Sequence, residues 1–158
     1  RTAYGKPILL YPEGLYFNVS HSGKWVVVIF HSNEVGIDIE QIKIIDSVGL
    51  AKFFSVVEYK HLLALSEPER LKCFYELWTL KESYVKALGT GLSVPLDSFS
   101  FKKSNNGYVL DETPFETCYH FKQYILEGSY VVSACVRDGI FPDQVQQVAV
   151  STLLQSFT

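Results

Sequence analysis

The sequence has no methionine, only three cysteines and no long apolar run. Cys73, Cys118 and Cys135 are too few and too widely spaced for a disulfide framework or a zinc site, so each is expected to be a reduced core residue. No apolar stretch approaches the roughly 20 residues of a membrane-spanning helix, and no signal peptide is recognisable. These absences favour a cytoplasmic protein. Because the chain starts at Arg1 and has no start residue, we expect it to be a piece of a longer one.

Neither positive nor negative charge is in large excess. The net charge is −3 and is spread along the chain, which argues against a dedicated nucleic-acid binder, because such proteins usually carry a basic face. A small basic pocket for a phosphorylated ligand stays compatible with it. With 158 residues, 47 % of them hydrophobic and 15 % aromatic, the chain is expected to be globular, either as one compact domain or as two small subdomains that share a core.

The apolar pattern predicts an α+β fold in which antiparallel hairpins flank one long helix. The apolar run at 24–30 is nearly continuous, which predicts burial on both faces. The segment 143–154 is ambiguous between helix and strand. Strands are expected at 15–20, 24–30, 35–40, 98–103, 108–110, 119–126 and 129–136.

Two helices have recognisable starts. "SVVE" at 55–58 and "SEPE" at 66–69 match the capping box, in which a serine is followed three residues later by a glutamate. The second box is expected to open a long helix from about Glu67 to Leu88, ended by Gly89. Its apolar stripe consists of Leu71, Phe74, Trp78, Val85 and Leu88.

The stretch "GIDIE" at 36–40 combines an apolar face with two acids. In a strand, Ile37 and Ile39 point to one face with Val35, while Asp38 and Glu40 point to the other, roughly 7 Å apart. Like charges at that separation repel and raise each other's pKa. On its own, such a pair is compatible with a solvated strand edge.

The helical stretch "WTLKESYVK" at 78–86 supplies a third acid. Trp78, Glu82 and Lys86 follow one another at i,i+4 spacing and share a face, with Lys81 beside it. Taken alone, Glu82 and Lys86 would form an exposed ion pair worth a few tenths of a kcal/mol.

A different chemistry follows if this helix face meets the acidic strand face. Three carboxylates would then converge, and a divalent cation with oxygen ligands, Mg²⁺ or Mn²⁺, would offset their repulsion. The nearby lysines would hold an anion as point charges. This combination suits pyrophosphate chemistry, in which positioning and charge neutralisation dominate.

"NVSHSG" at 18–23 places a serine beside a histidine. Adjacent residues of an extended segment point to opposite faces, so Ser20 and His21 are poorly placed to act as a nucleophile and its base. They are better placed to contact a ligand phosphate. Glu58 is most simply a capping-box residue.

The motifs together resemble the Sfp-type phosphopantetheinyl transferases of peptide and polyketide synthesis. The resemblance runs from the start of the chain to about residue 136, and the pairing of G-[ID]-D-x-E with W-x-x-K-E-[SA]-x-x-K is its most specific part. The matching stretches are "YGKP" (4–7), "FNVSHSG" (17–23), "GIDIE" (36–40), "FFSVVEY" (53–59), "WTLKESYVKALGTGL" (78–92) and "PLDSFSF" (95–101).

The resemblance implies an enzyme that moves the phosphopantetheine arm of coenzyme A onto a serine of an apo peptidyl or acyl carrier protein and releases 3′,5′-ADP. It implies that Asp38, Glu40 and Glu82 hold a Mg²⁺ that bridges the pyrophosphate, with Mn²⁺ as a substitute. Glu82 or Glu40 would help to deprotonate the carrier serine. Lys86 would neutralise or protonate the leaving phosphate, with assistance from Lys81. Nonribosomal peptide and antibiotic biosynthesis would be the setting.

The same resemblance implies a coenzyme A site. Ser20 would contact the diphosphate and His21 the 3′-phosphate. The residues that would border the adenine pocket are Tyr4, Gly5, Lys6 and Pro7.

The family fold is a pseudo-twofold pair of α/β subdomains with antiparallel sheets and a long central helix, and coenzyme A lies in the cleft between them. Residues 1–32 are accordingly expected to be the end of the first subdomain and residues 33–158 the second. An absent first part would expose apolar strand surface and invite self-association. The carrier is expected to dock on apolar surface near residues 42–57.

Two other functions remain open at this point. One is a binding module, a catalytically impaired fragment that holds coenzyme A or a carrier without turnover. The other is an unrelated Mg²⁺-dependent phosphohydrolase, which would share the acids and lysines, use water as acceptor and need no carrier protein.

Overall fold

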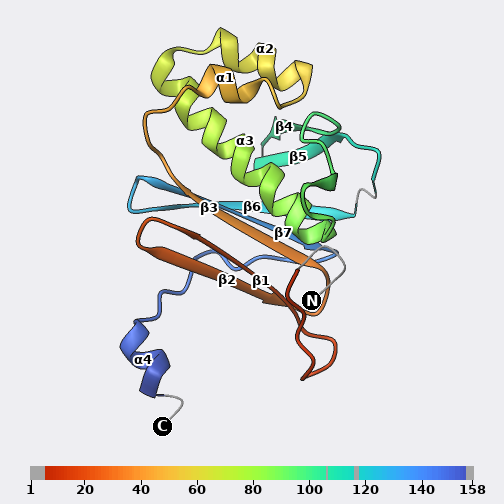
Figure 1. Ribbon diagram of the computed structural model, residues 1–158, viewed down its shortest axis with the longest axis vertical. Helices are drawn as coiled ribbons and strands as arrows, with labels where there is room; N and C mark the ends of the chain where they lie inside the picture. Colours follow the sequence, from red (N-terminus) through yellow and green to blue (C-terminus); the bar gives the residue numbers. More distant parts are fainter. Residues whose placement is uncertain (1–5, 106, 116–117, 156–158) are drawn as a thin grey trace.

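The computed structural model describes residues 6–105, 107–115 and 118–155. They form an α+β fold whose strands are all antiparallel (Figure 1). A three-stranded sheet has the order β3-β7-β6, and two-stranded sheets are formed by β1-β2 and β4-β5. The strands are β1 (Tyr16–Ser22), β2 (Trp25–His31), β3 (Val35–Gln41), β4 (Ser100–Ser104), β5 (Gly107–Glu112), β6 (Tyr119–Leu126) and β7 (Tyr130–Arg137).

The helices are α1 (Ser47–Ala51), α2 (Val56–Ala64), α3 (Glu67–Leu88) and α4 (Val150–Gln155), with a short 3-10 turn, η1 (Gly91–Ser93). The predicted starts of α2 and α3 are confirmed, since the carboxylates of Glu58 and Glu69 accept hydrogen bonds from the backbone of Ser55 and Ser66. Gly89 ends α3 in the left-handed conformation, with a φ of 69°. The ambiguous segment at 143–154 contains the start of α4.

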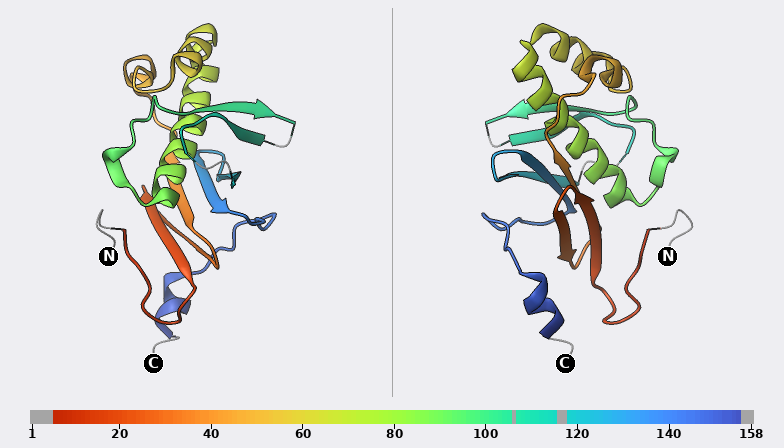
Figure 2. Two further views of the ribbon diagram at one scale, coloured as in Figure 1. Left: turned by 90° about the vertical axis from the view of Figure 1, so that its right-hand side faces the viewer. Right: turned by 60° about the vertical axis from the view of Figure 1, so that its left-hand side comes forward.

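Helix α3 lies across the central sheet, with β4-β5 beside it, while α1 and α2 lie near its amino-terminal end (Figures 1 and 2). It approaches β3 at Gly36, where a Cβ atom would stand 1.9 Å from the carbonyl oxygen of Ser83. Only glycine allows that approach. The Thr79 hydroxyl also lies 2.7 Å from that of Ser133 on β7. The helix is therefore held close to the strand that carries "GIDIE".

Two apolar clusters form the core. The larger surrounds α3, where Phe74, Leu80 and Tyr84 are almost completely buried. The ring of Tyr84 meets those of Tyr119 and Phe121 on β6, and Phe74 stacks on Phe54. The smaller lies between the central sheet and β2 and contains Val27, Ile37, Ile39, Tyr130 and Val132. The apolar face of "GIDIE" thus packs toward β2, as its alternation predicts.

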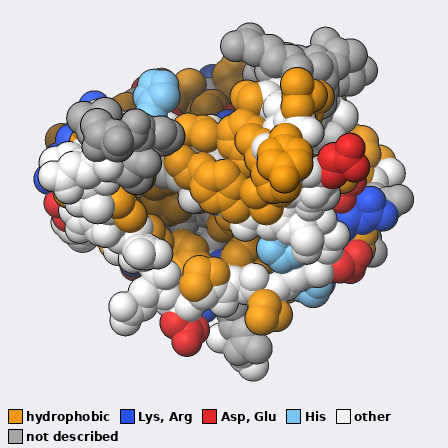
Figure 3. All heavy atoms as spheres, turned by 90° about the horizontal axis from the view of Figure 1, so that it is seen from below, with side chains coloured by type: hydrophobic (Ala, Val, Ile, Leu, Met, Phe, Trp, Pro, Cys, Tyr) orange, Lys and Arg blue, Asp and Glu red, His pale blue; other side chains and the backbone are white. Residues whose placement is uncertain are grey.

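The prediction that β2 is buried on both faces is wrong. Val27 is 6 % exposed, but its neighbours Val26 and Phe30 are 65 % and 58 % exposed. One face of β1-β2 packs toward β3, whereas the described residues leave the other face open. Figure 3 views this side of the molecule and shows hydrophobic side chains gathered there. The predicted subdomain boundary at 32/33 falls between β2 and β3, and the division itself stays a prediction.

Candidate active site

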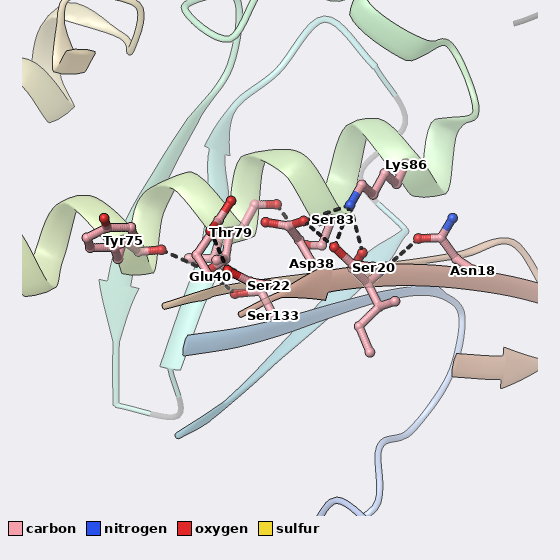
Figure 4. Close-up of polar contacts among 12 residues, drawn as sticks. Asn18, Ser20, Ser22, Asp38, Glu40, Tyr75, Thr79, Ser83, Lys86 and Ser133 are labelled. Atoms are coloured by element: carbon pink, nitrogen blue, oxygen red, sulfur yellow. Dashed lines mark hydrogen bonds and ion pairs between the residues drawn. The ribbon is translucent and has the colours of Figure 1, made fainter. Parts of the chain in front are cut away.

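Strand β1 lies along β3 and is attached to it through side chains. The backbone N–H of Ile37 donates to Oδ1 of Asn18 at 2.9 Å, and the N–H of Gln41 donates to Oγ of Ser22 at 3.1 Å. These two hydrogen bonds fix the register of β1 relative to β3. Ser20 and Ser22 therefore lie beside Asp38 and Glu40 (Figure 4).

Asp38 is the centre of this group. Its side chain is buried, and its Oδ1 accepts hydrogen bonds from Ser20 Oγ at 2.9 Å and from Lys86 Nζ at 2.6 Å. Lys86 also donates to Ser20 Oγ at 3.0 Å and to the carbonyl of Ile37 at 3.3 Å. Oδ2 of Asp38 is buried without a hydrogen-bond partner among the described protein atoms. A buried carboxylate oxygen without a partner is costly, so this atom is suited to a ligand.

Glu40 repeats the pattern two residues along the strand. Its Oε2 accepts a hydrogen bond from Ser22 Oγ at 3.0 Å. The hydroxyl of Ser22 already accepts from Gln41 N–H, so its proton is available for the carboxylate. The two serines of "SHS" thus each hold one acid of "DIE".

Glu82 of α3 belongs to the same electrostatic group. Burial is the main cause that raises its pKa, and the negative charges of Asp38 and Glu40 raise it further, while Lys86 lowers it. Burial also raises the pKa of Asp38, against the opposing effect of Lys86, and that of Glu40, against the hydrogen bond from Ser22. The helix face meets the acidic strand face at the ion pair between Lys86 and Asp38, whose Nζ and Oδ1 lie 2.6 Å apart.

The donors of this group fit a hard cation such as Mg²⁺. They are carboxylate oxygens, and Oδ2 of Asp38 has no partner. Burial raises the pKa of all three groups, and the negative charge of Asp38 raises those of Glu40 and Glu82 further. As they stand, no three Asp, Glu, His or Cys side chains among the described residues surround one point closely enough to hold an ion. Asp38, Glu40 and Glu82 accordingly stay predicted ligands.

Lys81 is not brought to the carboxylates. Its Nζ is completely buried, 2.8 Å from Oε2 of Glu58, and donates at 2.7 Å to the carbonyls of both Leu96 and Phe99. These contacts use its three ammonium hydrogens. The role expected for Lys81 at the leaving phosphate stays a prediction, and this geometry does not favour it.

The residues expected to contact coenzyme A differ in their exposure to solvent. Ser20 is buried and His21 is exposed on the opposite face of β1, which agrees with the argument against a nucleophile pair. Pro7 is exposed, and the ammonium of Lys6 contacts backbone carbonyls of α3 and β3. Tyr4 and Gly5 lie outside the described residues.

The sequence did not predict that Ser22 holds Glu40 or that Lys81 has an interior partner in Glu58. A signal for the first was present, because two serines two residues apart match the spacing of the two acids. When two neighbouring strands are aligned in register, side chains with the same two-residue spacing lie beside one another. No local pattern connects Glu58 with Lys81.

A family model described as "4'-phosphopantetheinyl transferase superfamily" matches residues 34–135, from the start of β3 to β7. The chain belongs to this family. It is by class a transferase, as the family name states. The matched region contains all three predicted metal ligands and Lys86.

Individual relatives agree. The chain is 41 % identical to "4'-phosphopantetheinyl transferase Sfp" of Bacillus subtilis over 153 residues, which are 96 % of this chain and 68 % of that protein. It is 37 % identical to "4'-phosphopantetheinyl transferase gsp" of Aneurinibacillus migulanus, over 85 % of this chain and 56 % of that one. The chain thus spans 68 % of the length of the Sfp relative and 56 % of the length of the gsp relative.

Solved structures share the fold. The holo-[acyl-carrier-protein] synthase of Thermotoga maritima superposes with a TM-score of 0.56 at 24 % identity, over 77 % of this chain and 73 % of that one. A holo-(acyl-carrier-protein) synthase of Bacillus anthracis gives 0.55 at 23 % identity, over 65 % of this chain and 93 % of that one. These likenesses support the predicted fold class. Among the described residues, no helix has the length and apolar character to cross a bilayer.

Proposed function

We propose that the chain transfers the phosphopantetheine arm of coenzyme A to a serine of an apo peptidyl or acyl carrier protein, with release of 3′,5′-ADP and dependence on Mg²⁺. The observation that carries the proposal is the buried Oδ2 of Asp38, which has no partner although Oδ1 is held by Lys86 and Ser20. The site thus offers a ligand oxygen and a cation side by side, which a diphosphate with its counter-ion requires.

Asp38, Glu40 and Glu82 would hold Mg²⁺, which when bound supplies positive charge to the diphosphate oxygens. Glu82 or Glu40 would accept the proton of the carrier serine. Burial raises the pKa of both groups toward the value that general-base work needs. Lys86 would neutralise or protonate the leaving phosphate as its ammonium turns from Asp38 to the ligand.

The expected phosphate contacts of Ser20 and His21 are part of this proposal. The hydroxyl of Ser20 bridges Asp38 and Lys86, so it would reach a diphosphate bound at the same ammonium. The names of the family, of Sfp and of gsp support the phosphopantetheine arm as the group transferred, and the motif resemblance supports carrier proteins as the acceptors. The Bacillus anthracis neighbour is described as a complex with CoA (3',5'-ADP), which supports coenzyme A as the donor.

A mass-spectrometric assay tests the proposal. When this chain is mixed with an apo peptidyl carrier, coenzyme A and Mg²⁺, the carrier is expected to gain the mass of one phosphopantetheine unit. EDTA is expected to abolish the gain, because the carboxylates would repel the diphosphate without a cation. A carrier in which the acceptor serine is replaced by alanine is the control. Coenzyme A binding without transfer would support the binding module, and carrier-independent release of a phosphate would support the phosphohydrolase.

The carrier is proposed to dock on α1, α2 and the segment before them. These elements expose the apolar side chains of Ile44, Phe53, Val56 and Val57. Ile44 also lines a hollow of about 600 Å³, together with Ile45 and Leu71. The segment leaves β3 directly after Glu40 and Gln41, so a carrier bound there would lie near the proposed base. Exposed apolar patches of this kind are typical of interaction sites.

Replacing Phe53 with aspartate is expected to raise the KM for the carrier about tenfold, which corresponds to about 1.4 kcal/mol, because a charge would replace an apolar anchor. Phe53 is 63 % exposed, so the fold should tolerate the change. Steady-state kinetics with varied carrier and fixed coenzyme A would measure it. Ile140→Asp, at an exposed apolar residue of the carboxyl-terminal segment, is the matched control. An unchanged KM for the carrier in Phe53→Asp would place the docking surface elsewhere.

A further inference from the structure

The ammonium of Lys6 binds two elements of the site at once. Nζ donates to the carbonyl of Val35 on β3 at 2.8 Å, and to the carbonyls of Lys86 and Ala87 on α3 at 2.6 and 3.2 Å. The side chain is partly buried, and burial lowers its pKa. Lys6 precedes β1 in sequence and reaches residues that lie about eighty positions further along the chain.

The two helical acceptors are carbonyls that the helix itself does not satisfy. Helix α3 ends at Leu88, and the last four carbonyls of a helix have no partner within it. Gly89 N–H takes the carbonyl of Val85. Lys6 takes the next two, and its positive charge lies at the negative end of the helix dipole. A lysine outside the helix thus acts as its carboxyl-terminal cap.

The capped turn is the one that carries Lys86. While Lys6 holds the backbone carbonyl of Lys86, the side chain of Lys86 reaches back to Asp38 and Ser20. On the strand, the third acceptor, Val35, lies three residues before Asp38. It also adjoins Gly36, where a Cβ atom would collide with the backbone of α3. Lys6 therefore fixes the two backbones from which the Lys86–Asp38 pair projects.

We propose that Lys6 is a positioning residue for the transfer and that it acts through Lys86. The inference rests on the proposed function for its catalytic part. In this role the Lys6 ammonium binds backbone carbonyls of the protein. In the alternative role, expected for residues 4–7 from the resemblance, Lys6 would contact the adenine of bound coenzyme A. The two roles differ in what they do to kinetics, since a positioning residue changes kcat and a ligand contact changes the KM for coenzyme A.

Lys6→Met, which keeps the length and removes the donors, is expected to lower kcat about 10- to 100-fold, because a displaced group can cost a factor on the order of 100. The KM for coenzyme A should stay within about threefold of the wild-type value. Lys6→Arg keeps N–H donors and should recover most of the rate. Lys102→Met, at an exposed lysine of β4, should leave kcat unchanged.

A double variant tests whether the effect passes through Lys86. If it does, Lys6→Met added to Lys86→Met should cause no further loss of kcat, because coupled residues are not additive. Full additivity, or a large rise in KM for coenzyme A with kcat unchanged, would overturn the proposal.

Hydrogen–deuterium exchange tests whether Lys6 caps α3, and it does not require an active enzyme. Amides of residues 83–89 should exchange about tenfold faster in Lys6→Met, while those of α2 should not change. Equal exchange in wild type and variant would refute the cap. A wild-type chain that binds but transfers nothing would refute the proposed function and the catalytic part of this inference, and the exchange result would still decide the cap.

Discussion

Replacing Asp38 with alanine is expected to abolish transfer, with a loss on the order of 100- to 1,000-fold or more in kcat, while the chain stays folded. The change removes a predicted metal ligand and the carboxylate partner of Lys86. The freed ammonium is partly exposed, with 28 % of the Lys86 side chain accessible, so water can solvate it and the fold need not break. The mass gain of an apo carrier measures transfer, and circular dichroism checks the fold.

Metal binding gives this prediction a second readout. Added Mg²⁺ should raise the Tm of the wild-type chain, since a ligand that binds only the folded state stabilises it, and should not raise that of Asp38→Ala. Asp38→Asn, which keeps the size but not the charge, should behave like the alanine variant. Asp111→Ala, which breaks an exposed ion pair with Lys102, is the matched control. Wild-type activity in Asp38→Ala would refute the assignment of Asp38 to the metal.

The helix limits were predictable because they depend on local chemistry. A serine and a glutamate three residues apart satisfy each other's backbone at the helix start, and Gly89 accepts a positive φ at the helix end. The five-residue helix α1 gave no such signal, since it is too short for a helical period to show. Likewise, the apolar run in β2 could not reveal that its outer face stays open, because burial depends on what else packs there.

The candidate site was predictable in part. Alternation in β3 and the four-residue spacing on α3 predicted that the strand acids and the helix face meet, and Lys86 of α3 does contact Asp38 of β3, whereas Asp38, Glu40 and Glu82 stay predicted metal ligands. Lys81 and Glu82, however, are one residue apart and point about 100° apart around the helix, so only one of them can face β3. The preference of Lys81 for the interior depends on Glu58 in another helix, which was visible in the sequence only as a capping residue.

The pair of Glu58 and Lys81 carries the second large expected effect. Oε2 of Glu58 accepts from Lys81 Nζ and Ser55 Oγ, both at 2.8 Å, and its Oε1 accepts from the N–H of Phe101 at 2.9 Å. Burial lowers the pKa of Lys81, although the charge of Glu58 opposes that shift. One completely buried ion pair thus joins α2, α3 and β4.

Lys81→Met is expected to lower the free energy of unfolding by about 3 to 5 kcal/mol, because it leaves a buried carboxylate without its counter-ion and two carbonyls without donors. Urea denaturation would measure the change. Lys72→Met, which removes an exposed partner of Glu76 on the same helix, should cost about 0.5 kcal/mol or less. Since Lys81 does not reach Asp38, the variant should keep most of its kcat per folded molecule at low temperature. A loss of stability below about 1 kcal/mol together with a collapse of kcat would mean that Lys81 serves the leaving phosphate after all, and that the buried pair opens when substrate binds.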